Sequence, residues 1–405
     1  MLRKIPKRYI SMVPGELKKI LSLVVNKACK TGPFIEKFEN KFSEYVGAKE
    51  AIAFSSGRFA LYLALKYFGL KKGDKIIVSA YNFQGVPKML IKEGFVPLFV
   101  DADKDTYQID TKGITERIDK DTKAIIVTHL FGQLCDLGVI LDIAKKHNLL
   151  VIEDCAHALG SYYRGKHAGL FGDIGFFSFT GSKMLNTSFG GMLVTNNTDL
   201  AEKIRRDLSS YRFPNLAEVF IQRLITYFYA IYSNKYFYSL FFYPLSLLIN
   251  LINMDPLEVY KRLKKKEIAE KKMKFSNLQA MIGLEQMDYI GEHILKRKDM
   301  TKALIKKLEP SISIQKPCFE SEPCCLMFPI KAKNKAGTFK KLIFRGIDSN
   351  LSYASDCSGL MSGVRAPTAK FLSESILSIN LPLDLKEDEI NYIAKVLNDV
   401  KSSLY

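Results

Sequence analysis

The chain has 405 residues, of which 47% are hydrophobic and 25% charged, and its formal net charge is +18. A chain of this length exceeds a single hydrophobic core, so we expect two domains, and its near-average composition excludes a disordered or low-complexity protein. The positive charge indicates an anionic partner, for which nucleic acid, phosphorylated metabolites and anionic lipid all qualify.

The cysteines and the N-terminal residues bear on the compartment. The seven cysteines are odd in number and form no C-x-x-C pair, which argues against a disulfide framework and against a zinc site. The first residues are basic and contain no uninterrupted apolar run of signal-peptide length. We therefore expect a reducing, cytoplasmic location and no metal site.

Short apolar runs alternate with helix-like stretches between residues 51 and 195. Continuous runs of Val, Ile and Phe are typical of strands covered on both faces, so they predict a mostly parallel sheet in an α/β fold. One helix is expected at 58–69, where Gly69 would end it, and another at 140–149. The expected strands are AIAF (51–54), KIIVSA (75–80), VPLFVDA (96–102), AIIVTHLF (124–131), LLVIEDCA (149–156), IGFFSF (174–179) and GGMLVT (190–195).

Polar clusters follow several of these strands. In open parallel sheets, ligands bind beyond the carboxyl ends of the strands, so we expect the clusters to converge on one rim. The clusters are SSGR (55–58), YNFQ (81–84), HLFG (129–132), EDCAH (153–157) and FSFTGSK (177–183).

Residues 216–254 are exceptionally apolar. They include a run of 19 residues without charge at 236–254, and the segment 261–274 that follows is strongly basic. A spanning helix needs about 20 apolar residues, but Pro244 and two asparagines weaken a simple span. The segment would also suit a two-helix hairpin lying in the interface of an anionic membrane, or an apolar oligomer contact.

The sequence pattern changes after about residue 275. A long helix-like segment at 275–300 leads into short strand-like pieces and a last helix at 386–400. This pattern predicts a smaller α+β domain at the C-terminal end of the chain.

Asp154 and Lys183 are the first candidates for chemistry, because each lies at the end of an apolar strand. A buried carboxylate is costly unless it has a partner, and the pyridinium nitrogen of pyridoxal phosphate is one such partner. This cofactor also needs a lysine to which it can bind covalently. Their positions at strand ends also allow another interpretation, in which Lys183 is a solvated loop residue and Asp154 only caps a helix.

Ordered motifs along nearly the whole chain resemble the DegT/DnrJ/StrS family of sugar aminotransferases. The family consists of fold-type I pyridoxal-phosphate enzymes that act on keto sugars attached to nucleotides. The motifs are GPFIEKFENKFSEYVGAKEAIAFSSGRFAL (32–61), GDKIIVSAYNF (73–83), GFVPLFVDADKDTYQID (94–110), TKAIIVTHLFGQLCD (122–136), VIEDCAHALGS (151–161), GLFGDIGFFSFTGSK (169–183), GGMLVTNN (190–197), FSNLQAMIGLEQMD (275–288) and LSINLPLDLKEDEI (377–390).

The resemblance implies roles around the cofactor ring. Lys183 matches the lysine that holds the cofactor covalently and moves the proton during catalysis. Asp154 matches the partner of the pyridine nitrogen, and His157 lies where the family has Gln or His beside the 3-hydroxyl group. Phe83 matches the aromatic residue that stacks on the ring.

The resemblance also implies a phosphate site, with departures from the family. Ser178 matches a phosphate-binding hydroxyl, and Gly57 with Arg58 occupies the turn whose backbone N–H groups face the phosphate. Arg58 replaces the usual Thr, and Lys272 aligns with an Asn that reaches over from the partner subunit. Both replacements add charge that suits a phosphate.

Two further departures concern the substrate. Phe189 stands where the family often has an acidic residue, and residues 350–361 lack the usual His- and Pro-containing loop. Between residues 213 and 274 the family needs only a short connection, but this chain has about sixty residues there. The identity of the sugar substrate therefore does not follow from the resemblance to the family.

Composition and resemblance together predict the domain organisation. We expect residues 1–30 to pack on the small domain, and 31–274 to form the large cofactor-binding domain with an apolar and basic insertion at about 214–272. Residues 275–405 would form a linking helix and the small domain.

The implied function is amination of a nucleotide-linked keto sugar, with L-glutamate as donor, for a surface glycan. The family implies a homodimer with shared active sites, and the insertion suggests a peripheral location at the membrane. A related dehydratase carries His in place of Lys183. A non-catalytic protein on the same fold that binds membrane or nucleic acid stays open as well, but no nucleic-acid motif is present, so we expect no nucleic-acid partner.

Overall fold

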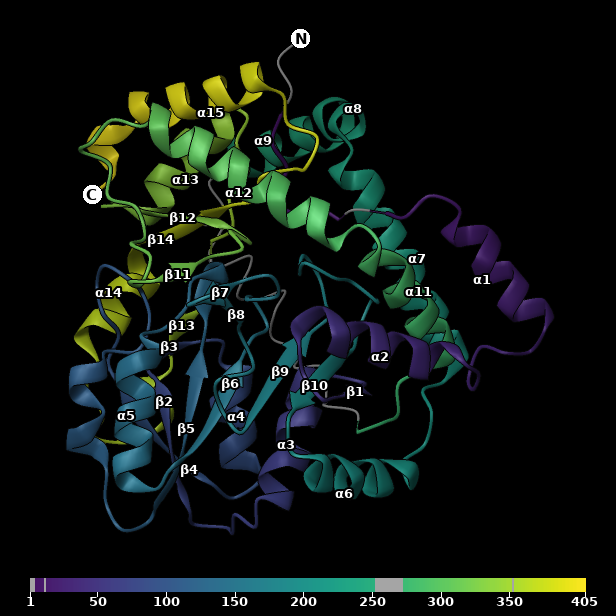
Figure 1. Ribbon diagram of the computed structural model, residues 1–405. Helices are drawn as coiled ribbons and strands as arrows, with labels where there is room; N and C mark the ends of the chain where they lie inside the picture. The colour runs from purple at the N-terminus through teal and green to yellow at the C-terminus, as the bar shows by residue number, and fades with distance from the viewer. Residues whose placement is uncertain (1–3, 11, 252–271, 352) are drawn as a thin grey trace.

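The computed structural model describes residues 4–10, 12–251, 272–351 and 353–405 (Figure 1). Its central sheet has seven strands in the order β1-β10-β9-β6-β5-β2-β4, and β10 alone in this sheet runs against the others. The predicted mostly parallel sheet is therefore confirmed. The strands are β1 Glu50–Phe54, β2 Lys75–Ser79, β4 Val96–Val100, β5 Thr122–Thr128, β6 Leu150–Asp154, β9 Ile174–Ser178 and β10 Gly191–Thr195.

Helices between these strands cover the sheet. Helix α3 begins where Ser56 accepts a hydrogen bond from the backbone N–H of Phe59 at 3.1 Å, which caps the helix. After its C-terminal end, Gly69 has a φ of +74°, as a chain reversal at this position requires. The helices of this part of the chain are α1 Glu16–Val25, α2 Phe34–Val46, α3 Gly57–Tyr67, α4 Gly85–Lys92, α5 Leu137–His147 and α6 Thr198–Ser209, of which α1 and α2 precede β1 and α6 follows β10.

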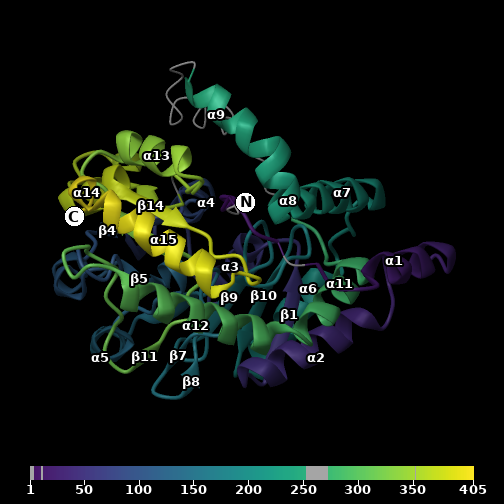
Figure 2. The same ribbon diagram turned by 90° about the horizontal axis from the view of Figure 1, so that it is seen from above.

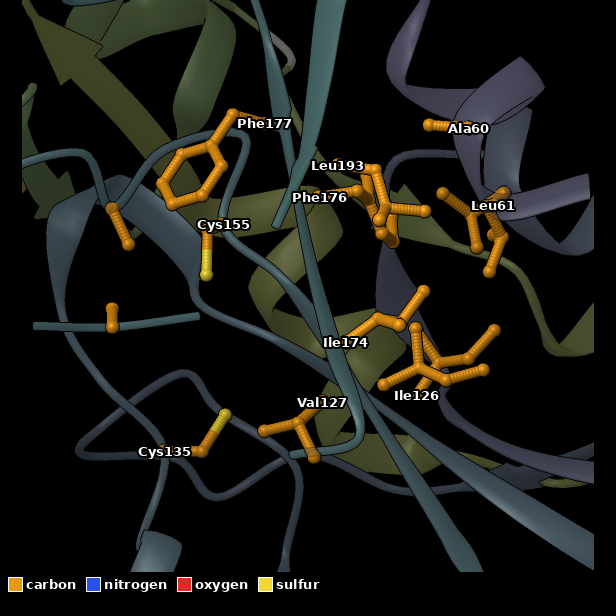
Figure 3. Close-up of a cluster of buried hydrophobic side chains, with 14 of the residues drawn as sticks. Ala60, Leu61, Ile126, Val127, Cys135, Cys155, Ile174, Phe176, Phe177 and Leu193 are labelled. Atoms are coloured by element: carbon orange, nitrogen blue, oxygen red, sulfur yellow. The ribbon is translucent and has the colours of Figure 1, made fainter. Parts of the chain in front are cut away.

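The large core lies between the sheet and these helices. Ile126, Val127 and Ile174 are fully buried, at 0% exposure, because helices cover both faces of their strands. Burial of each such side chain contributes about 1.5–3 kcal/mol. Figure 3 shows side chains from β5, β9 and β10 gathered with Ala60 and Leu61 of α3. All seven cysteines are free thiols.

The C-terminal residues form a second core. Strand β12 (Phe328–Lys331) pairs antiparallel with β14 (Ile376–Ile379), and helices pack around this pair. The helices are α12 Ile290–Lys307, α13 Lys335–Phe344 and α15 Glu387–Asp399. Helix α14 (Pro367–Ser375) leads into β14, but its buried residues belong to the large core. Short strands connect the parts of the fold: β3 Tyr81–Asn82, β7 Tyr162–Tyr163, β8 Lys166–His167, β11 Ser321–Glu322 and β13 Ser355–Asp356.

The long helix predicted at 275–300 is wrong, because the segment forms two helices. Helix α11 (Asn277–Met287) ends before Asp288, and α12 starts at Ile290. The capping box of α11 joins Ser276 to Gln279, and α11 packs on α2 of the large core. Helix α12 packs on α15 of the small core, so the break lets each helix follow its own domain.

The N-terminal segment packs on the core of the small domain and on a third, smaller apolar cluster. Ile5 forms a bridge with Ile347 and is buried in the core of the small domain. Helix α1 instead packs on α11, with Ile20 and Leu23 buried against it. The segment thus fastens the small domain to the large one.

The apolar insertion is helical in its described part. It contains α7 (Leu216–Ser233), the short α8 (Lys235–Phe237), a π-helical turn at Tyr238–Phe242 and α9 (Tyr243–Leu251), which extends outward in Figure 2. Tyr238 lies in the core of the small domain and donates its hydroxyl to Asp348 at 3.1 Å. No helix within the described residues is long and apolar enough to span a membrane. Most of the basic segment 261–274 lies outside the described residues.

Candidate active site

Polar residues meet at the carboxyl edge of the parallel strands. Thr128 at the end of β5 pairs with Asp154 at the end of β6, which in turn pairs with Phe176 of β9. His129 donates its backbone N–H to the carbonyl oxygen of Asp154 at 3.1 Å. The rim on which the sequence places its polar clusters is therefore continuous across these strands.

Asp154 presents a buried carboxylate at this rim. The residue is 4% exposed, and within the described residues its carboxylate accepts one hydrogen bond, from the backbone N–H of Ala156 at 3.0 Å. Burial raises the pKa of Asp154, and the Ala156 N–H and the Lys183 ammonium act in the opposite direction. Since a buried carboxylate is costly without donors, Asp154 suits a ligand that brings a cationic N–H group.

The backbone fixes the tautomer of His157. The N–H of Phe131 donates to Nδ1 of His157 at 3.0 Å, so the proton of the neutral imidazole lies on Nε2. Burial and the nearby Lys183 ammonium lower the pKa of His157 well below its usual range. His157 is therefore a neutral hydrogen-bond donor at physiological pH.

Lys183 lies beside an aromatic residue from the small domain. Its Nζ is 4.8 Å from the ring centroid of Tyr353, and that ring lies edge-on to His157 with centroids 4.6 Å apart. Strand β13, just beyond Tyr353, pairs with β3 beside Phe83. The structure thus brings Lys183, Asp154 and His157 into one electrostatic neighbourhood.

Tyr353 is a site residue that the sequence patterns do not predict. It belongs to the 350–361 segment, which lacks the family's usual His and Pro. The tyrosine within that otherwise divergent segment is the one local signal that points to it.

The start of α3 forms a second part of the site. Phe54 at the end of β1 pairs with Gly191, which pairs on its other side with Ser178. A Cβ atom on Gly191 would lie only 2.4 Å from the backbone nitrogen of Gly57. Glycine at 191 therefore lets the N-terminus of α3 lie close to β9.

Arg58 and Phe83 lie together beside this helix N-terminus. The guanidinium carbon of Arg58 is 5.9 Å from the ring centroid of Phe83, whose side chain is 41% exposed. The hydroxyls of Ser178 and Thr180 are hydrogen-bonded at 3.1 Å. An exposed aromatic face, a cation, hydroxyls and a helix N-terminus thus share one end of the site.

Lys272 is engaged within its own chain. Its Nζ is 2.9 Å from a carboxylate oxygen of Glu93 and 3.2 Å from the ring centroid of Tyr62. The adjacent Met273 N–H donates to Ser55 at 3.3 Å, which holds this segment next to the start of α3. The role of Lys272 toward the phosphate of a partner subunit stays a prediction.

Phe189 packs away from the cofactor residues. Its side chain lies against the cluster that joins α1, α7 and α11, which includes Val219 and Leu278. The insertion therefore supplies an apolar neighbour at the position where the family often has an acidic residue.

Glu153 supports the site from behind. This fully buried carboxylate accepts hydrogen bonds from the N–H groups of Gly169, Phe171 and Gly172 and lies 3.2 Å from Nε2 of His129. Although burial opposes it, these bonds hold the pKa of Glu153 below its usual range. His129 and Cys155 complete a group of possible metal ligands, but the oxygens of Glu153 already have partners.

The residues present fit pyridoxal phosphate, the cofactor of the family suggested by the sequence. The carboxylate of Asp154 can accept a further hydrogen bond from a ring N–H, and His157 offers a donor at Nε2. Lys183 supplies the amine, and the start of α3 with Arg58 and Ser178 supplies groups that bind a phosphate. These residues would hold the cofactor.

The sheet and the residues at its rim fit the fold and the cofactor site of fold-type I pyridoxal-phosphate-dependent proteins. The model of the DegT/DnrJ/EryC1/StrS aminotransferase family matches residues 12–229. The chain therefore belongs to this family.

Similar proteins of known name or structure agree with this assignment. The chain is 44% identical to GDP-perosamine synthase of Escherichia coli O157:H7 over 172 residues, which is 42% of this chain and 47% of that protein. It thus spans about half the length of the curated relatives it matches.

Two solved structures share the fold. The aminotransferase from Psychrobacter cryohalolentis superimposes with a TM-score of 0.77 at 23% identity, over 97% of this chain and 98% of that chain. GDP-4-keto-6-deoxy-D-mannose-3-dehydratase of E. coli, with bound hydrated pyridoxal phosphate, gives a TM-score of 0.76 at 21% identity, over 98% of this chain and 100% of that chain. Both similarities are evidence for the fold alone.

Proposed function

We propose that the protein is a pyridoxal-phosphate-dependent aminotransferase that converts a nucleotide-linked keto sugar to an amino sugar for a surface glycan. Family membership supports this activity, and the observation that carries it is the grouping of Lys183 with Asp154 and His157. L-Glutamate is the proposed amino donor.

Each residue of the group has a distinct task in the proposed reaction. Pyridoxal phosphate, when bound, supplies an electron sink for the carbon that loses or gains a proton. Asp154 would hold a proton at the ring nitrogen, which would keep that sink effective. His157 would donate its Nε2–H to the ring oxygen, and Lys183 would move the proton at the reacting carbon.

Tyr353 helps to enclose the amine. Its ring stands over Lys183 Nζ and against His157, so it restricts water on that side of the site. Water exclusion strengthens the charge interactions among these groups.

The first test is spectroscopic. Purified protein should show the visible absorbance of a lysine-bound cofactor, and L-glutamate alone should bleach it in a half-reaction. A colourless protein that gains no visible band with added pyridoxal phosphate would contradict the proposal.

Dehydration is the second candidate reaction, because a dehydratase shares the fold. Lysine at position 183 favours transamination, since the related dehydratase branch carries histidine there. Transfer of nitrogen from L-glutamate to a keto-sugar panel separates the two reactions, because a dehydratase would release water without forming an amino sugar.

We further propose a homodimer in which the partner subunit completes each site. The cofactor-stacking candidate Phe83 is 41% exposed at the rim, where a partner could cover it. Analytical ultracentrifugation should give twice the mass of the 405-residue chain. A monomer with full activity would contradict the shared site.

We also propose that the insertion docks on an anionic membrane surface. Its exposed apolar side chains are Ile221, Leu224, Ile225, Phe228, Ile231, Tyr236, Phe237, Leu240, Phe241, Leu245 and Leu248. This much exposed apolar surface indicates an interaction site, and the basic segment 261–274 suits anionic head groups. A membrane location would suit a protein that acts in the synthesis of a surface glycan.

Co-sedimentation with phosphatidylcholine vesicles, with and without phosphatidylglycerol, tests the docking. Leu240 and Phe241 are 60% and 59% exposed, so L240E/F241E should abolish binding without unfolding the protein. Phe319, which is 82% exposed on the small domain, provides the matched control F319E. If L240E/F241E changed the oligomeric state and not vesicle binding, the apolar surface would be an oligomer contact.

A further inference from the structure

A cavity beside Lys183 has an unusual balance of charge. It lies between the N-terminal segment, the Lys183 loop and the two helices α11 and α12, and its polar lining includes Tyr9, Lys183, Asn186, Gln286, His293 and Arg297. Its described lining contains an arginine, a lysine and one imidazole but no carboxylate. Such a cavity attracts an anion.

Arg297 is the buried cation of this cavity. The residue is 6% exposed, and its Nη1 makes only long hydrogen bonds, at 3.3 Å to the carbonyl of Leu326 and 3.4 Å to that of Leu381. Its Nε is buried and has no hydrogen-bond partner in the described part of the chain. Burial lowers the pKa of Arg297, which reflects the poor solvation of its charge.

A second buried arginine shows what Arg297 lacks. Arg223 is 3% exposed, and its Nε donates to a carboxylate oxygen of Glu16 at 2.7 Å. Its Nη2 also donates to the same carboxylate. A buried charge is costly unless it is paired, so Arg297 is suited to a counter-ion that comes from outside the chain.

We propose that Arg297 binds the α-carboxylate of the amino-acid donor, an inference that rests on the proposed aminotransferase function. The planar guanidinium group forms two parallel hydrogen bonds with a carboxylate. Lys183 lines the same cavity, so an anion on Arg297 belongs to the molecule whose amine reacts near Lys183. The groups that suit the cofactor phosphate lie at the start of α3, away from this cavity. Of the two substrates of the proposed reaction, the amino acid is the one whose reacting amine is attached to a carbon that carries a carboxylate.

His293 would report the arrival of the carboxylate. It is half-buried and lines the cavity, and burial together with the charge of Arg297 lowers its pKa. A carboxylate bound to Arg297 would offset that charge and raise the pKa of His293.

The test compares three forms of the holoenzyme: wild type, R297Q and R345Q. Arg345 is an exposed arginine on the small domain and serves as the control. Stopped-flow absorbance follows the half-reaction with L-glutamate, and calorimetry follows binding of glutarate, which has carboxylates but no amine. We expect R297Q to weaken both by about ten- to a hundredfold, because a charged hydrogen-bonded partner is lost, and R345Q to match wild type.

A measurement on the unaltered protein covers the case in which R297Q does not fold. Histidine-labelled wild-type enzyme is titrated with glutarate, and H293N identifies the His293 resonance by its loss. We expect glutarate to move this resonance and to raise the pKa of His293.

The outcomes separate this inference from the proposed function. If wild type bleaches with L-glutamate but folded R297Q responds like R345Q, Arg297 is not the carboxylate site. An unmoved His293 resonance in saturating glutarate would also overturn the inference. If wild type holds no cofactor and ignores L-glutamate, the aminotransferase proposal itself fails.

Discussion

The buried ion pair between Glu16 and Arg223 offers a sharp test of how the insertion is held. The two side chains are 1% and 3% exposed, and the hydroxyl of Tyr227 also donates to Glu16 at 2.9 Å. Glu16→Ala would leave the Arg223 guanidinium buried without its carboxylate. We expect the free energy of unfolding to fall by about 3–5 kcal/mol, because removing one partner of a buried pair leaves an uncompensated charge.

Urea denaturation followed by circular dichroism measures this loss. The double variant E16L/R223M removes both charges and should recover most of the stability, since an apolar pair of similar volume can replace a buried ion pair. The exposed pair Glu292–Lys296 is the control, and E292A should cost less than about 1 kcal/mol because its partners are 57% and 50% exposed. A loss for Glu16→Ala no larger than that for E292A would refute the reasoning.

Three further changes test the site. Lys183→Ala should abolish turnover and the visible band of the lysine-bound cofactor, and a variant that kept both would disprove the assignment. Gly191→Ala should lower cofactor affinity at least tenfold in a spectral titration, because its Cβ would meet the Gly57 nitrogen at 2.4 Å and push α3 away; an unchanged affinity would remove this reason for the glycine. The pKa of His157 lies well below that of an unfolded histidine, about 6.5, so below that pH the unfolded chain binds the extra proton and stability falls. His157→Gln should make the loss of stability between about pH 6.5 and 5 shallower, and an unaltered slope in urea titrations would exclude a buried neutral His157 as its cause.

Local patterns predicted most of the large domain. The apolar runs at 75–80 and 174–179 became β2 and β9, because continuous apolar sequence suits strands that helices cover on both faces. The candidate residues at the strand ends lie on one rim for the same reason, since parallel strands place their carboxyl ends together. Family motifs then gave each candidate a role.

The errors and omissions arose where distant segments meet. The break between α11 and α12 could not be predicted, because the apolar periodicity continues through it. The break arises because α11 packs on the large core and α12 on the small one. Tyr353 and Arg297 lie far from Lys183 in sequence, and no local pattern links them to it. The apolar segment 216–254 predicted helices but not that Arg223 would be fastened to Glu16.

The sequence by itself therefore determined the sheet, the family and the candidate cofactor residues, because these depend on local periodicity and on motifs at strand ends. The tertiary structure decided the proton position on His157 and the covering of Lys183 by Tyr353, and it left Nε of Arg297 without a hydrogen-bond partner among the described residues. These features depend on which charges and donors lie within a few ångströms after folding, and that proximity is not encoded in any one segment.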